Sequence, residues 1–410
     1  MNVVGTEYIK LSEPEKKVCR EEYRLLPPQR AEIQKLVQTI WKNPELSWKE
    51  KKTCELEIAF LKKHGFTVTN PYCGMDTAYR AEFGHRSGTP AFAFCAELDA
   101  LPKVGHACGH HLVSGSAIAA ALIVKELLVK KNIPGKIVVF GCPAEESGGG
   151  KINLAERGAL EGVDAVMMAH PFNESAALYD PGYAGIKTAK IKFTGTGGSG
   201  VARCANPKLV NPLDAQTLLY QAVALRRHYT PGNVAVIGVI TEGGERSNVI
   251  PVSTTSVYTI RSQDLNELKK TAEMLHKMAK GAAMMTGAKL RFELSGRYEP
   301  TLPCYPLSDI YLEAAGALGM ETRNGRGQLM FAATDFGNLS QLRPGVHVHF
   351  PAGIRDALHT AGFAAGANKE KAYEYMFITG SAMAFTAMKY IQDPKYRKIV
   401  NDTFRTMKAK

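Results

Sequence analysis

The feature that most constrains this chain is an alternation of strand-like and helix-like segments that is interrupted once. Strand-like runs such as "PAFAFCAELDA" and "GKIVVFGCP" alternate with helical segments over the first part of the chain, residues 1–187. This alternation predicts an α/β domain with a mostly parallel sheet. Because "PAFAFCAELDA" is almost continuously apolar, we expect that strand to lie in the middle of the sheet.

Residues 188–298 follow a different order of elements, namely strand, helix, strand, strand, helix and strand. That order predicts a ferredoxin-like α+β arrangement. The first pattern then resumes over residues 299–410, which include the long apolar helix "EKAYEYMFITGSAMAFTAMKYI". We therefore expect one α/β domain, made of residues 1–187 and 299–410, with a ferredoxin-like domain inserted into it.

Composition narrows the class of protein. The formal charge of +12 comes from 51 Lys and Arg against 39 Asp and Glu, scattered along the chain, and no basic stripe predicts binding to nucleic acid. The longest apolar run, "SGSAIAAALIVKELL", is broken by Lys125 and predicts a buried helix, so we expect no membrane contact. Eight irregularly spaced cysteines and the absence of an apolar leader favour a reducing, cytoplasmic setting.

Polar residues follow four of the predicted strands and loops, at the sheet edge where functional groups gather in open α/β folds. They are Glu97 and Asp99 in "AELDALP", Cys108 and His110 in "GHACGHH", Glu145 and Glu146 in "CPAEESGGG", and His170 in "MMAHP". Thiolate, imidazole and carboxylate are the ligand types of zinc and related divalent ions. Each segment alone has a simpler interpretation, such as a core histidine or a solvated Glu pair. Together they indicate a metal site.

These segments also carry a family resemblance. "ELDALPKVGHACGHHL", "CPAEESGGGK", "AHP", "NVIP" and "DALHT" occur in the order and spacing of peptidase family M20, over roughly residues 28–390. The chain resembles most its amidohydrolase and Xaa-Arg dipeptidase-like branch, which is related to aminoacylases and aminobenzoyl-glutamate hydrolases. The resemblance implies a hydrolase that cleaves a small amide or dipeptide with a free carboxylate through a metal-activated water. The inserted domain would be the lid and dimerisation domain of the family.

The resemblance also implies a role for individual residues. Cys108 would bridge two divalent ions, zinc first and manganese as the alternative. Two ligands would complete each site, His110 and Glu146 for the first and His170 and His359 for the second. Glu145 would be the general base and Asp99 would orient a ligand histidine. Spacing alone does not choose among the C-terminal His347, His349 and His359, but "DALHT" matches the family motif at His359. His106 and His111 are expected to support the site without binding metal.

In the inserted domain, Asn248 and Arg261 resemble residues that hold a substrate carboxylate, a task that suits the planar guanidinium of arginine. An ordinary surface ion pair is the alternative for Arg261. The resemblance further implies a homodimer formed through this domain. We expect its strand "TAKIKFTG" to offer a free edge for pairing across a two-fold axis.

One segment departs from the family. Relatives carry a histidine in a "G-K-A-A-H-A-A" segment of the lid, and that histidine stabilises the developing oxyanion. This chain has "FTGTGGSGVARCANP", with Ser199 near the expected position and Arg203 as the candidate replacement. Three explanations stay open: a replacement group, a slow hydrolase, or a non-hydrolytic, metal-dependent biosynthetic enzyme on the same fold. An inactive metal-binding protein would predict a damaged ligand set, and this sequence keeps every ligand.

Overall fold

The structure is a computed structural model that describes residues 7–84, 88–201, 206, 208–326 and 330–409. The chain forms two compact units. The first unit comprises Met1–Gly182, Thr301–Gln328 and Asp335–Lys410, and the second comprises Tyr183–Pro300 and Leu329–Thr334. The sequence placed the insertion at residues 188–298, so the observed second unit extends slightly further at both ends. It also takes up Leu329–Thr334, which the sequence did not indicate.

An eight-stranded mixed sheet forms the centre of the first unit, in the order β1-β2-β4-β3-β5-β14-β6-β13. Its four middle strands run parallel to one another: β4 (Lys136–Cys142), β3 (Ala91–Glu97), β5 (Ala165–Phe172) and β14 (Gly345–Pro351). The outer strands are shorter: β1 (Thr67–Thr69), β2 (Tyr79–Gly84), β6 (Ala177–Leu178) and β13 (Thr322–Arg323). Every residue of β3 is buried, which confirms the prediction that this apolar strand is central.

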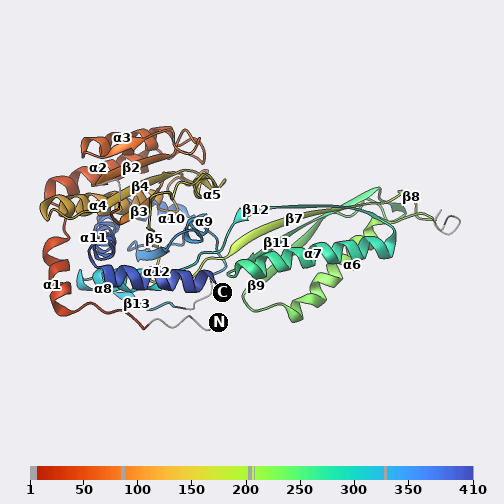
Figure 1. Ribbon diagram of the computed structural model, residues 1–410. Helices are drawn as coiled ribbons and strands as arrows, with labels where there is room; N and C mark the ends of the chain where they lie inside the picture. Colours follow the sequence, from red (N-terminus) through yellow and green to blue (C-terminus); the bar gives the residue numbers. More distant parts are fainter. Residues whose placement is uncertain (1–6, 85–87, 202–205, 207, 327–329, 410) are drawn as a thin grey trace. The chain divides into compact units, whose positions relative to one another are not determined.

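Helices from both ends of the chain pack on this sheet, so red, orange and blue segments share the first unit in Figure 1. The pair α4 (His110–Lys130) and α11 (Glu370–Gln392) pack against each other. Helix α4 is long and apolar enough to cross a membrane, but 83% of its apolar window is buried inside the protein, as expected for a core helix. The other helices are α1 (Glu13–Glu22), α2 (Pro27–Lys42), α3 (Lys51–Lys63), α5 (Gly150–Glu156), α8 (Tyr305–Ala317), α9 (Phe336–Ser340), α10 (Ala361–Gly366) and α12 (Pro394–Lys408).

The second unit is a four-stranded antiparallel sheet with two helices on one face (Figure 1). Its elements follow the predicted order: β7 (Gly185–Thr194), α6 (Pro212–Arg226), β9 (Val234–Glu242), β11 (Ser253–Ser262), α7 (Leu265–Thr286) and β12 (Lys289–Tyr298). The spatial order β12-β7-β11-β9 is that of a ferredoxin-like sheet. A short ladder of β8 (Gly198–Ser199) and β10 (Val249–Ile250) lies outside this sheet.

The structure corrects one prediction for this unit. Strand β7, which contains "TAKIKFTG", pairs with β11 on one side and with β12 on the other, so it has no free edge. The prediction was wrong because β12, the last strand in sequence, inserts beside the first. Among the described strands of this sheet, the edges are β9 and β12.

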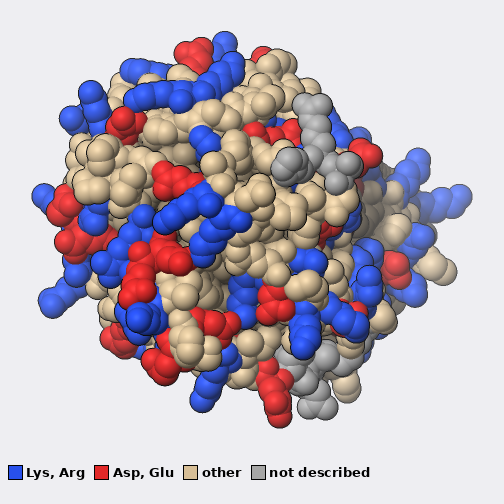
Figure 2. Space-filling model, turned by 60° about the vertical axis from the view of Figure 1, so that its left-hand side comes forward, with Lys and Arg blue, Asp and Glu red and all other residues tan. Residues whose placement is uncertain are grey.

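Charged side chains are mixed over the surface. Figure 2 shows Lys and Arg interspersed with Asp and Glu over the visible face, without a stripe of one sign. This distribution agrees with the scattered charges of the sequence. It gives no support to a nucleic-acid-binding surface on that face.

Candidate metal centre

The candidate site lies at the carboxyl edge of the parallel strands in the first unit. Strand β3 ends at Glu97, the loop after β4 carries the paired glutamates, and α4 begins at His110. Because parallel strands end at the same edge, residues far apart in sequence meet there. The site residues from this part of the chain are Glu97, Asp99, Cys108, His110, Glu145, Glu146 and His170.

Cys108 is at the centre of this group. Its Sγ atom lies 3.3 Å from Nε2 of His170 and 3.4 Å from Nε2 of His359. Cys108 belongs to two overlapping sets whose donor atoms lie within 4.8 Å of one another, Cys108–His110–His170 and Cys108–Glu146–His359. The structure thus brings together all five residues predicted as ligands. How the other four divide between two ions stays a prediction.

The structure places His359, and neither of the other two C-terminal histidines, beside Cys108. His359 has a positive φ of 65°, and its Nε2 also lies 3.6 Å from Oε1 of Glu146. His347 and His349 belong to β14, where their rings stack on His170 and Phe172, respectively. Among the described residues, neither joins a cluster of donor atoms.

His106 and His111 also lie outside the clusters of donor atoms among the described residues. Both are buried, and their ring centroids are 5.1 Å apart. Burial is the main reason that the pKa of His106 falls to about 4, so its ring stays neutral at physiological pH. Nε2 of His111 also lies 3.1 Å from the carbonyl oxygen of Ala367.

Asp99 joins the paired glutamates to His110. Its carboxylate accepts hydrogen bonds from the backbone N–H groups of Glu145 and Glu146, at 3.2 and 3.0 Å, and from the Ser47 hydroxyl at 2.7 Å. The Nδ1 atom of His110 lies 2.8 Å from the Asp99 carbonyl oxygen and 3.2 Å from its carboxylate. Because Asp99 engages Nδ1, Nε2 of His110 faces the carboxylates of Glu97 and Glu146, at 3.3 and 3.9 Å.

Burial and neighbouring charges set the protonation of this cluster. Burial raises the pKa of the Cys108 thiol, although His110 opposes this effect. Burial lowers the pKa of His110, but the charges of Glu97 and Cys108 outweigh it and raise that pKa well above its usual value. Burial lowers the pKa of His170 to about 4. Burial, and next the charges of Glu97 and Asp335, raise the pKa of Glu145.

The donor set fits a divalent cation. Nε2 of His110 and Oε1 of Glu146 are buried and have no hydrogen-bond partner among the described residues. Buried polar atoms without partners are unfavourable, and a cation bound between them would satisfy both. A thiolate with imidazole and carboxylate ligands is a donor set that zinc accepts.

The predicted substrate-binding residues of the second unit fall into two places. Ser199 pairs with Val249, and the neighbouring Gly200 donates its N–H to the Asn248 carbonyl at 2.8 Å, so Ser199 and Asn248 lie close together and exposed. Arg261 lies near the opposite end of β11, where its guanidinium donates to the backbone carbonyl of Phe331. Arg203 lies outside the described residues.

Two charged residues next to this site, Lys151 and Asp335, were not identified from the sequence. Lys151 is fully buried, and its Nζ lies 2.7 Å from Oε1 of Glu97 and 2.6 Å from Oδ1 of Asp335. A lysine in the first turn of a helix is ordinarily solvated, so Lys151 gave no signal by itself. Burial lowers its pKa, but the carboxylates of Asp335 and Glu97 outweigh burial and raise the pKa well above its usual value.

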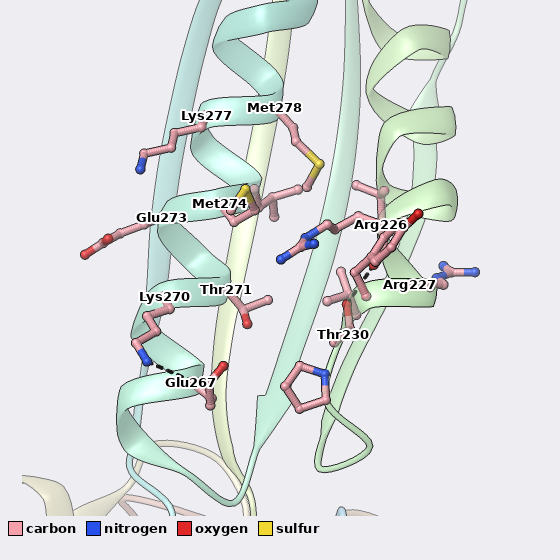
Figure 3. A pocket seen from close by; sticks show the side chains of 15 residues that line it. Arg226, Arg227, Thr230, Glu267, Lys270, Thr271, Glu273, Met274, Lys277 and Met278 are labelled. Atoms are coloured by element: carbon pink, nitrogen blue, oxygen red, sulfur yellow. Dashed lines mark hydrogen bonds and ion pairs between the residues drawn. The ribbon is translucent and has the colours of Figure 1, made fainter.

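A hollow of about 260 Å³ lies within the second unit, between the end of α6 and helix α7 (Figure 3). Arg226 points across it toward Met274, and Lys270 pairs with Glu267 at its rim, at 2.9 Å. Its described lining residues include neither Cys nor His. The donor atoms suited to catalysis are therefore those gathered around Cys108 in the first unit.

Comparison with known proteins decides the family. The model of peptidase family M20/M25/M40 matches residues 93–381, more than half of the chain. The chain is a member of peptidase family M20. As an M20 peptidase, it is a hydrolase that acts on amide or peptide bonds.

The similar members include enzymes of known activity. The chain is 34% identical to the Xaa-Arg dipeptidase of Mus musculus, over 90% of this chain and 88% of that protein. It is 29% identical to a p-aminobenzoyl-glutamate hydrolase chain of Escherichia coli, over 72% of this chain and 63% of that protein. The fold resembles a Bacillus subtilis structure described as a dinuclear metal binding peptidase from M20 family, with a TM-score of 0.71, 21% identity, and coverage of 88% of this chain and 98% of that one.

Proposed function

We propose that this M20 hydrolase is an amidohydrolase or dipeptidase with two metal ions, and that it cleaves a small amide or dipeptide carrying a free carboxylate. The observation that carries the proposal is the position of Cys108 in two overlapping sets of donor atoms. A thiolate shared between two sets suits a bridging ligand. Zinc fits this donor set, and manganese is the alternative. The dipeptidase and aminobenzoyl-glutamate hydrolase relatives support a substrate of this class.

Two divalent ions, when bound, would polarise the scissile carbonyl and acidify a water molecule. Glu145 would take the proton from the attacking water and pass it to the nitrogen of the leaving amine. Its raised pKa suits a group that first accepts and then donates a proton. Asp99 would hold the backbone of Glu145 and Glu146 in place during these proton transfers.

The substrate carboxylate would be held by residues of the second unit. Asn248 and Arg261 are the proposed partners, with Ser199 and Arg203 on the loop where relatives carry a histidine. Ser253, next to β10, and Arg261 are eight residues apart on one extended strand, which separates them by roughly 26 Å. One small substrate therefore cannot touch both ends of a single second unit. Both groups of residues could contact one substrate if they came from two copies of the chain.

We accordingly propose a homodimer formed through the second unit. Of the two described edge strands, β12 exposes the charged residues Lys289, Arg291 and Glu293, which disfavours edge pairing. Strand β9 exposes Ile237 and Val239 beside its free edge, with 61% and 57% of their surface accessible. An apolar edge strand favours β9 as the dimer contact. Val239→Lys should shift the sedimentation of the protein to that of a monomer, whereas Lys190→Glu on the interior strand should not.

We also propose that the enzyme works in the cytoplasm on small molecules, without nucleic acid or membrane partners. The described cysteines are all unpaired, including several buried in the core, such as Cys19, Cys54 and Cys95. Unpaired cysteines are usual in a reducing compartment. This supports the assignment made from the composition of the chain.

Bound metal and amine release together test the main proposal. Elemental analysis of the wild type, Cys108→Ala and Cys19→Ala would accompany assays of amine release from N-acyl amino acids and Xaa-Arg dipeptides. We expect about two metals per chain in the wild type and in Cys19→Ala, because Cys19 is buried in α1 and belongs to no described cluster of donor atoms. Cys108→Ala should lose metal and cleavage. A wild type without metal would contradict the proposal.

A second candidate function is suggested by the absence of the histidine that relatives carry in the lid. With Ser199 near the position where relatives carry that histidine, the centre is a candidate for bond formation or rearrangement in a biosynthetic step. About two metals per chain with no cleavage of any amide in the panel would favour this second function. Cleavage at an ordinary rate would exclude it.

A further inference from the structure

Glu97 is placed between a buried lysine and the predicted metal centre. It is the last residue of β3, and its side chain is 1% exposed. Oε1 accepts a hydrogen bond from Lys151 at 2.7 Å. Oε2 lies 3.3 Å from Nε2 of His110 and has no hydrogen-bond partner among the described residues. One oxygen is therefore fixed, and the other faces a ligand nitrogen.

The atoms facing Oε2 make no hydrogen bond among the described residues. Nδ1 of His110 is engaged by Asp99, so Nε2 is the nitrogen available to a metal ion. Nε2 is buried without a described hydrogen-bond partner, and Oε1 of Glu146, 3.9 Å from it, is in the same condition. Nε2 of His110 thus lies between two buried carboxylates, 3.3 Å from Oε2 of Glu97 and 3.9 Å from Oε1 of Glu146. Burial of such atoms is unfavourable unless another group completes the arrangement.

Lys151 and Asp335 hold Glu97 in this orientation. The Lys151 ammonium lies between Glu97 and Asp335, and the Lys151 backbone N–H donates to Oδ2 of Asp335 at 2.9 Å. Asp335 immediately precedes α9, and Lys151 lies in α5, so three elements are fixed to one another at this point. One ammonium between two carboxylates leaves a net negative charge. That charge remains for a cation on the other side of Glu97.

We propose that Glu97 is an additional ligand of the metal centre, with Oε2 binding the ion held by His110 and with Lys151 and Asp335 as positioning residues. The inference rests on the proposed two-metal function and extends it. A further carboxylate oxygen raises the number of ligands at the His110 ion above the set predicted from the sequence. Harder oxygen donors and a higher coordination number favour ions such as manganese or cobalt over tetrahedral zinc at that position.

Cobalt binding to the metal-free full-length protein tests this assignment. Titration calorimetry gives the affinity of each ion, and visible absorption of bound Co²⁺ reports its coordination number, because its absorption strengthens as coordination falls toward four. For Glu97→Gln we expect one of two binding events to weaken on the order of 10- to 100-fold, with stronger visible absorption. Glu97→Asp keeps the negative charge but moves the carboxylate away from the ion, because its side chain is one methylene shorter. It should therefore show the same weakened binding and stronger absorption as Glu97→Gln. Lys151→Met should weaken the binding of the same ion, but by a smaller factor.

Glu82→Gln is the matched control, because Glu82 pairs with Arg80 and Lys136 elsewhere on the sheet. It should leave both affinities and the spectrum unchanged. Folded Glu97→Gln or Glu97→Asp protein with wild-type affinities and spectrum would overturn the assignment of Glu97 alone. Equal weakening of both ions with an unchanged spectrum would also overturn it, because a distant charge acts in that way. A wild type that binds no cobalt, zinc or manganese would instead overturn the proposed function.

Discussion

The backbone N–H of His359 donates a hydrogen bond of 2.9 Å to the carbonyl oxygen of Ala107. This bond joins the "DALHT" loop to the "HACGHH" loop and places the His359 ring 3.4 Å from the Cys108 thiol. His359 adopts a positive φ, which is unfavourable by roughly 1–3 kcal/mol for a residue other than glycine. Backbone strain of this kind concentrates at functional sites. The backbone of its loop therefore sets the orientation of His359.

Metal binding should release protons. The pKa of the Cys108 thiol is raised by burial, and the pKa of His110 is raised by Glu97 and Cys108, so both groups hold a proton at pH 7 without metal. Ligation requires the thiolate and the neutral imidazole. We expect release of roughly two protons per chain, measured by titration calorimetry in buffers of different ionisation enthalpy. Binding without any proton release would contradict these assignments.

Substitutions of the adjacent residues Glu145 and Glu146 should have different effects. Glu145→Gln removes the proposed base and should lower kcat by about 10²- to 10⁴-fold while the bound metal is retained. Glu146→Gln should instead reduce the metal content, because Oε1 of Glu146 lies near both His110 and His359. Steady-state kinetics and elemental analysis of the same preparations give both quantities. Unchanged turnover in Glu145→Gln would exclude it as the base.

Restoring a histidine on the lid loop should accelerate hydrolysis. Ser199 is exposed on β8, where pairing with Val249 fixes its backbone, so a larger side chain can be accommodated. If the missing oxyanion donor limits the rate, Ser199→His should raise kcat about tenfold or more, and Ser199→Ala should remain near the wild type. Amine release under saturating substrate measures the change. An unaltered rate in Ser199→His would show that another group already serves as the donor.

A buried carboxyl away from the site should make stability depend on pH. Burial raises the pKa of Glu57 to about 7, whereas in the unfolded chain it is near the usual value of 4.5. The folded state therefore binds this proton more tightly, so this contribution to the free energy of unfolding is complete below about pH 4.5 and is lost as the pH rises to about 7. Glu57→Gln should match the wild type near pH 4.5 and exceed it at pH 8 by up to about 3 kcal/mol.

Thermal unfolding at pH 4.5 and pH 8 would measure this effect of Glu57→Gln. The exposed neighbour Glu55 on the same helix provides the control, because Glu55→Gln should leave the pH dependence unchanged. A difference in melting temperature between Glu57→Gln and the wild type that is the same at both pH values would contradict the prediction.

The fold and the cluster could be foreseen for one reason. An apolar strand such as β3 is central in its sheet, and parallel strands end at a common edge, so His170 near the end of β5 and Cys108 in the loop after β3 were expected at the same edge. The interior position of β7 could not be foreseen, because the order of strands in sequence does not determine their order in space. Lys151 and Asp335 were equally hidden. Their interaction depends on two helices meeting beneath β3, which periodicity does not reveal.

The order of synthesis has a consequence for the sheet of the first unit. Strand β5 pairs with β14 from Val166–Gly345 to Phe172–Pro351, yet the whole ferredoxin-like unit lies between them in sequence. At ribosomal rates, β14 follows β5 by roughly 10–35 s. During that interval the nascent chain exposes the β5 edge, an aggregation hazard that chaperones commonly shield. Cys108 and His170 meet His359 only near the end of translation, so a truncated chain keeps four of the five predicted ligands and has no means of supplying the fifth.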